Sequence, residues 1–270
     1  SILASSKNLK ILTLDGDWST KTTSEGTLSA NDISKHKLQK LEELTLRGWL
    51  AIESKEFYAI LENAIHLKKL WLIFNDNFQH KLQPEDIPPG SLANLEELRV
   101  YIAEIDERTL AAMFEKTVKL KSLIIHGDET FAINAMPDNI LKNLENAEFF
   151  RISLNPNEVP VLLKKMTNLR ELRLVWNEDG TLSKLEPKHF PPEILKNLTR
   201  CKIDYKKVSL SVCKHILKHT RQLTEEAVEP INKAIKDKIT ERTKKMALAE
   251  QQTFERNKKH LEPKQKNLEE

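Results

Sequence analysis

Residues 67–74, with the sequence LKKLWLIF, contain leucines at positions 67, 70 and 72. The same pattern, L-x-x-L-x-L, recurs seven more times along the chain, and only Ala147 and Cys201 replace its large apolar residues. Its second and third positions are two residues apart, which puts both side chains on one face of a strand. We therefore expect eight short strands, spaced by 24 to 32 residues, whose motifs begin at Leu9, Leu41, Leu67, Leu95, Leu120, Leu144, Leu169 and Leu198.

The segments between these strands are of two alternating kinds. Long returns carry apolar residues spaced i, i+3, i+4, as at Phe57, Ile60 and Leu61, which indicates the buried face of a helix. Short returns are led by proline in three of four copies, as in IPPGSLANL and FPPEILKNL, and proline disfavours a helix through the residue before it. The helical returns should start near N-cap positions at Glu53, Asp106, Asn155 and Ser209.

Residues 9 to about 223 resemble an intracellular leucine-rich-repeat domain. The helical returns are similar to those of ribonuclease-inhibitor-like repeats, and the FPPEILKNL segment resembles the repeats of plant immune receptors. The combination of repeats with a charged tail resembles bacterial effectors that carry a coiled coil. The resemblance implies an α/β fold: a curved solenoid with a parallel concave sheet and alternating helical and short proline-led returns on its convex side. It also implies a buried polar side chain after every second strand, at Asp17, Asn75, Asp128 and Asn177.

The composition excludes several classes of protein. The chain has 270 residues, a formal net charge of +3, 39% hydrophobic residues and only six glycines, so it is neither collagen-like nor strongly basic. Its longest apolar run has five residues, too few for a membrane-spanning helix. Two cysteines, Cys201 and Cys213, cannot form a disulfide framework, which favours a reducing, cytoplasmic setting, or the host cytosol if the chain is a bacterial effector.

The side chains between the leucines should point outward along the concave face of the sheet, called the open face below. On the third to seventh strands these positions hold aromatic and apolar residues with arginines among them, a composition typical of protein-binding surfaces. The alternative is that these side chains only stack on one another across neighbouring strands. The predicted partner-binding residues are Trp71, Ile73, Arg99, Tyr101, Ile124, His126, Phe150, Arg173 and Val175.

Two further features concern the edges of the sheet. The residues after each first leucine run Lys10, Glu42, Lys68, Glu96, Lys121, Glu145, Arg170 and Thr199, so opposite charges should face each other and specify the strand register. Polar loops after the long-repeat strands contain Trp18, Phe78 and Trp176, which either anchor a partner or cover the core.

Residues 224–270 form a separate, charged segment that follows the repeats of residues 1–223. Val228, Ile231, Ile235, Ile239 and Met246 make a narrow apolar stripe that fits a helix. We expect its first turns to cap the last repeat, and its distal part, residues 240–270, to self-associate or be disordered. A solvated charged helix and a basic surface-binding helix are the alternatives.

Motifs for catalysis or phosphate binding are absent from the sequence, which lacks G-x-x-x-x-G-K, G-x-G-x-x-G, G-x-S-x-G and H-E-x-x-H. His215 and His219 could share a metal by spacing, but an exposed helix face explains them better, and core packing explains Cys201. We therefore expect a non-catalytic protein-binding module with no cofactor, metal or small-molecule substrate, and with neither nucleic acid nor membrane as its main partner. The alternatives are the substrate-recognition part of a larger enzyme, such as a ubiquitin-ligase-like effector, and a membrane or nucleic-acid adaptor acting through the basic tail.

Overall fold

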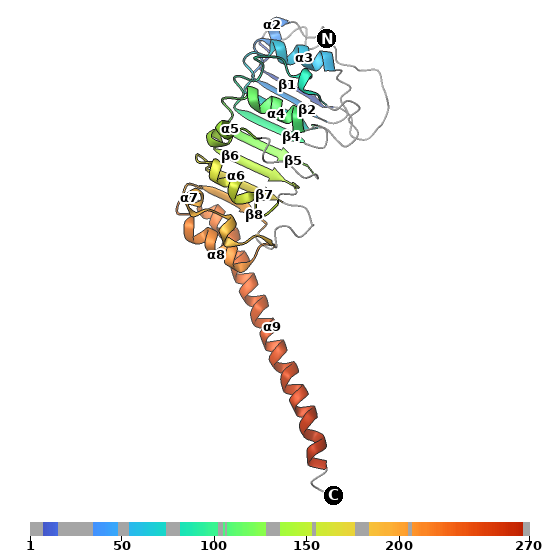
Figure 1. The fold of residues 1–270 in the computed structure, drawn as a ribbon, viewed down its shortest axis with the longest axis vertical. Helices are drawn as coiled ribbons and strands as arrows, with labels where there is room; N and C mark the ends of the chain where they lie inside the picture. The colour runs from blue at the N-terminus through green and yellow to red at the C-terminus, as the bar shows by residue number, and fades with distance from the viewer. Residues whose placement is uncertain are drawn as a thin grey trace, which may run out of the picture.

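The computed structural model describes residues 8–15, 35–47, 54–73, 82–101, 105, 107–127, 136–152, 155–175, 184–204 and 207–266. It contains one eight-stranded sheet in which every strand pairs in parallel with the next one along the chain (Figure 1). The strands are β1 (Ile11–Asp15), β2 (Glu43–Arg47), β3 (Lys69–Ile73), β4 (Glu97–Tyr101), β5 (Ser122–His126), β6 (Asn146–Phe150), β7 (Glu171–Val175) and β8 (Arg200–Ile203). The eight predicted strand motifs are confirmed.

The strand leucines stack in register and form the core. Leu44 pairs with Leu70, Leu70 with Leu98, and Leu98 with Leu123, and all four side chains are fully buried. Burying a leucine side chain contributes about 1.5 to 3 kcal/mol. A register shift of one residue would turn this whole column to the other face of the sheet, so the column holds the strands in one alignment.

The returns alternate as the sequence predicts. The long ones contain α3 (Ser54–Asn63), α4 (Glu107–Lys116), α6 (Val159–Lys165) and α8 (Leu210–His219). The short ones contain α2 (Lys35–Leu38), η2 (Pro84–Asp86), α5 (Asp138–Asn143), and η6 (Pro187–His189) with α7 (Pro192–Leu195). The helices bury their apolar residues, such as Phe57, Ile60 and Leu61 of α3, in the same core as the leucines. One face of the sheet is thereby covered, and none of the helices that the structure describes lies over the open face (Figure 1).

The N-cap prediction is right at α8 and wrong at α6. The Ser209 hydroxyl accepts a hydrogen bond from the Val212 backbone N–H at 3.3 Å. Helix α6 begins at Val159 instead of directly after Asn155, because Pro160 has no N–H to donate to the preceding turn. Asn155 Oδ1 accepts instead from the Asn157 N–H at 3.0 Å. Glu53 and Asp106 lie outside the described residues.

Helix α9 (Glu225–Lys266) follows the last strand and projects away from the sheet (Figure 1). Ala227, Ile231 and Ala234 are buried in its first turns, where α9 contacts α8 and β8. Farther along the predicted stripe, Ile239 and Met246 are exposed. The first turns therefore cover the end of the core, while Ile239 and Met246 farther along the stripe are not part of it. Among the described helices, none combines the length and the apolar character needed to cross a membrane.

Candidate functional site

The predicted partner-binding residues lie together on the open face, because alternate residues of a strand point to the same side of a sheet. Register places them in two rows that run across the strands. The middle row contains Trp71, Arg99, Ile124, Glu148 and Arg173 on β3 to β7. The end row, at the carboxyl ends of the strands, contains Arg47 and Ile73 on β2 and β3, and Tyr101, His126, Phe150 and Val175 on β4 to β7.

Trp71 is held by two residues of the adjacent strand β4. Its indole Nε1 donates a hydrogen bond to Glu97 Oε1 at 2.9 Å. The Arg99 guanidinium lies over the indole ring, with its Cζ 5.3 Å from the ring centroid. A cation over an aromatic face contributes about 0.5 to 1 kcal/mol at partly exposed sites. Trp71 is therefore partly buried and oriented, with its remaining surface on the open face.

A second aromatic cluster joins β5, β6 and β7. The rings of His126 and Phe150 are stacked, with centroids 4.3 Å apart and planes inclined by 11°. Arg173 places its Cζ 4.3 Å from the centroid of Phe150, and its Nη1 lies 3.4 Å from Glu148 Oε2. These contacts fix the orientation of Phe150 before any partner binds.

Ile124 departs from the prediction that it is an exposed contact residue. Its side chain is only 8% exposed. It lies in the middle row between Arg99 and Glu148, whose side chains are longer. Strands about 4.8 Å apart allow such neighbours to cover a shorter side chain. Ile124 therefore supports the open face and offers little surface to a partner.

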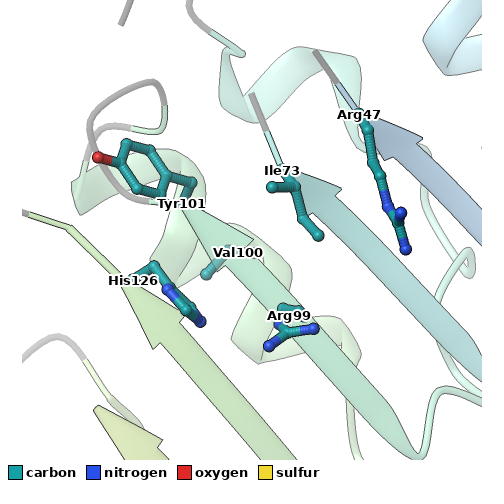
Figure 2. Close-up of a pocket in the computed structure, with 6 residues that line it drawn as sticks. All are labelled: Arg47, Ile73, Arg99, Val100, Tyr101 and His126. Carbon is teal, nitrogen blue, oxygen red and sulfur yellow. The ribbon is translucent and has the colours of Figure 1, made fainter. Parts of the chain in front are cut away.

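A hollow of about 300 Å³ lies on the open face over β2 to β5 (Figure 2). It is lined by Arg47, Ile73, Arg99, Val100, Tyr101 and His126. Figure 2 shows Arg47 and His126 on opposite sides of the hollow, Arg99 between them, and the Tyr101 ring on the same side as His126. The hollow thus combines cationic groups with apolar walls.

His126 is uncharged at neutral pH. Burial, together with the positive charges of Arg99, Arg173 and Arg151, lowers its pKa from 6.5 to about 4. Its Nε2 is buried and has no hydrogen-bond partner within the described part of the chain. Sequence reasoning missed the role of Arg151, which lies just beyond β6 at a φ of +54°, because the alternation that identifies outward residues ends with the strand.

Ion pairs between neighbouring strands support the register. Glu42 bridges Lys10 and Lys68, with Nζ–Oε distances of 2.6 and 2.8 Å, and hydrogen bonds from the two lysines lower the pKa of the Glu42 carboxyl to about 2. On the open face, Lys69 pairs with Glu43 at 2.9 Å and Arg200 with Glu171 at 3.2 Å. The predicted ladder of opposite charges is thus observed at its first three residues.

No cluster of three or more metal-ligating side chains occurs within the residues that the structure describes. His215 and His219 lie 4.6 Å apart by ring centroid and are partly buried, and His215 Nε2 is 2.9 Å from the carbonyl oxygen of Phe190. Cys201 and Cys213 are buried and not joined in a disulfide, and burial raises the pKa of the Cys213 thiol. A raised pKa leaves less of the reactive thiolate at neutral pH.

Several predicted residues lie outside the described part of the chain. These are the polar positions after the long-repeat strands, Asp17, Asn75, Asp128 and Asn177, and the loop aromatics Trp18, Phe78 and Trp176.

Neither a scan against protein-family models nor a search of curated proteins found a match to this sequence.

Proposed function

We propose that this chain is a leucine-rich-repeat protein that binds a protein partner through its open face, without catalysing a reaction. The observation that carries the proposal is that the middle row and the end row together present partly exposed aromatic and apolar side chains across five neighbouring strands, interleaved with arginines. The residues of this surface are Trp71, Ile73, Arg99, Tyr101, His126, Phe150, Arg173 and Val175.

The composition of the surface supports protein binding. Trp, Tyr and Arg are the residues most enriched among those that dominate the binding free energy of protein interfaces. Here Trp71 lies on β3, and Arg99 and Tyr101 lie on the neighbouring strand β4. The Arg99 guanidinium lies over the indole ring of Trp71. A large ring that is partly exposed on one side loses water from a substantial area when a partner covers it.

The fixed orientation of several side chains on this surface also supports protein binding. Binding loses free energy when mobile side chains must be ordered, at about 0.5 to 1.5 kcal/mol for each flexible side chain. The Trp71–Glu97 hydrogen bond and the stack of Arg173, Phe150 and His126 already order these side chains in the unbound chain. The surface therefore loses less conformational entropy on binding than unsupported aromatic side chains would.

The two buried cysteines, which are not joined in a disulfide, fit a reducing compartment, and we include a cytoplasmic location in the proposal.

The test is the triple substitution Trp71→Ala, Tyr101→Ala and Phe150→Ala. We expect it to abolish partner capture from a cell lysate while the unfolding midpoint changes little, because all three side chains are partly exposed. The matched control is Ile65→Ala, Val118→Ala and Val161→Ala, which removes exposed apolar side chains from the returns instead. Capture that survives the first triple substitution, or that is lost equally in the control, contradicts the proposal.

A further inference from the structure

Within the described part of the chain, neither of the two arginines that line the hollow, Arg47 and Arg99, forms a hydrogen-bonded ion pair with a carboxylate. The Arg47 Nε lies 3.8 Å from Asp15 Oδ1, beyond hydrogen-bonding distance. Arg173, which does not line the hollow, donates a hydrogen bond from Nη1 to Glu148 Oε2 at 3.4 Å. Arg99 forms no ion pair with any residue that the structure describes, and its observed contact is with the Trp71 ring. The two guanidinium groups of the hollow are thus available for a carboxylate that is not among the described residues.

Two atoms with unused hydrogen-bonding capacity, Arg47 Nε and His126 Nε2, belong to residues that line the hollow. Six buried side-chain nitrogen or oxygen atoms of the described residues have no hydrogen-bond partner, and three of them are Arg47 Nε, His126 Nε2 and Arg173 Nε. Buried polar atoms without partners are uncommon and each one calls for an explanation. The side chains of Arg47 and Arg173 remain 41% and 37% exposed, so a ligand can reach their terminal nitrogens.

The hollow limits the size of what enters it. Sites for small molecules usually measure about 300 to 1,000 Å³, and this one lies at the lower limit with about 300 Å³. One acidic side chain with its own backbone fits such a volume better than a cofactor does. The Ile73 and Tyr101 side chains add apolar walls against which neighbouring residues of a polypeptide can pack.

The charges at the other end of the strands argue against an extended polyanion. Glu43, Glu97 and Glu171 occupy the row at the amino ends of β2, β4 and β7, where Lys69 and Arg200 pair with the first and the last of them. A nucleic acid lying across the sheet would bring its phosphates close to these carboxylates, and like charges at close range are unfavourable. A single carboxylate placed over the arginine end avoids them.

We propose that the hollow binds the carboxylate of an acidic side chain in a protein partner, with Arg99 as the main donor and Arg47 and His126 beside it. This inference rests on the proposed function and names the chemistry that the open face recognises. The Arg99 guanidinium can offer two parallel N–H donors to one carboxylate. A neutral His126 with its proton on Nε2 donates a further hydrogen bond to the same carboxylate. The carboxylate thereby becomes the acceptor that His126 Nε2 lacks in the unbound chain.

The test uses the full chain and three immobilised heptapeptide libraries with random flanking residues. The central residue is Glu in the first library, Gln in the second and phosphoserine in the third. We expect the chain to bind the Glu library about tenfold more strongly than the Gln library, the ratio expected for one charge-assisted hydrogen-bond pair. Arg99→Gln should reduce this ratio to about one, and Arg99→Lys, which keeps the charge but loses the paired donors, should leave an intermediate ratio.

Arg200→Gln is the matched control, since Arg200 lies on the same face of the sheet on β8, outside the hollow. It should bind the Glu library like the unmodified chain. Equal binding of the Glu and Gln libraries by the unmodified chain overturns the inference, as does an unchanged ratio in Arg99→Gln or an equal loss in Arg200→Gln. A stronger, Arg99-dependent preference for phosphoserine assigns the hollow to a phosphoryl group instead, which also overturns it.

These outcomes are separable from failure of the proposed function. If the libraries show no preference for Glu but the triple alanine substitution still abolishes partner capture, the open face binds proteins without a carboxylate in the hollow. If capture survives the triple substitution, the proposed function itself fails, whatever the libraries show.

Discussion

Replacing His126 with glutamine should remove part of the acid sensitivity of the fold. In the folded chain the pKa of His126 is about 4, and its ordinary value is 6.5. A histidine with a lowered pKa stabilises the fold fully above pH 6.5, and this contribution is lost as the pH falls toward 4, because the unfolded chain then binds a proton that the folded chain does not. The pKa of His126 is lowered mainly by burial of its ring and secondly by the nearby arginines.

These values set the size of the effect. With the two pKa values above, the linkage relation gives a loss of up to about 2 kcal/mol in the free energy of unfolding between pH 7.5 and pH 5. The His126 ring is only partly buried, so we expect about 1 to 2 kcal/mol once solvent screening is included. Glu42, with its lowered pKa, contributes to acid sensitivity only below about pH 4.5 and does not overlap with this window.

Urea unfolding followed by tryptophan fluorescence at pH 7.5, 6.5, 5.5 and 5.0 measures the effect, because Trp71 reports on the sheet. The free energy of unfolding of the original chain should fall more steeply with decreasing pH than that of His126→Gln. The variant also loses the stacking contact with Phe150, which lowers its free energy of unfolding by the same amount at every pH. This constant difference does not affect the slope of the free energy of unfolding against pH, which is the quantity compared. His66→Gln, at an exposed histidine, controls for the substitution itself. Parallel pH profiles for the original chain and His126→Gln would refute the reasoning.

Two further predictions concern the core and the C-terminal helix. Leu123→Ala should lower the free energy of unfolding by about 2 to 5 kcal/mol, because Leu123 is fully buried and its register neighbour Ala147 is too small to fill the space. Urea titration measures this loss, and a loss below about 1 kcal/mol would contradict the prediction. Ile231→Ala should cost a similar amount, whereas deleting residues 238–270 should change the urea midpoint of the sheet little, because Ile231 is buried and Ile239 and Met246 are exposed. Equal destabilisation by both changes would show that distal α9 also packs on the sheet.

Much of the architecture follows from spacing that is local in the sequence. The L-x-x-L-x-L motif identifies all eight strands, and the two-residue alternation identifies which side chains reach the open face. The N-cap at Ser209 is equally local, because a hydroxyl and an N–H three residues later are all that it needs. At Asn155 the same local pattern misleads, since Pro160 delays the start of α6.

The arrangement of the open face depends on side-chain lengths on neighbouring strands. Ile124 and Val175 both occupy outward positions, yet Ile124 is buried, because it lies between Arg99 and Glu148 in the assembled sheet. The reach of Arg173 over Phe150 and of Trp71 to Glu97 likewise joins residues about 25 positions apart in the chain.

The amino-acid sequence by itself determined the strands, their order of stacking and the apolar character of the open face, because these depend on periodicities within a few residues. Only the tertiary structure decided that His126 loses its charge, that Arg99 lies over the Trp71 ring, and that α9 leaves the core after its first turns. Those properties depend on burial and on Coulomb interactions between strands, which act across space and carry no signal in the local spacing of residues.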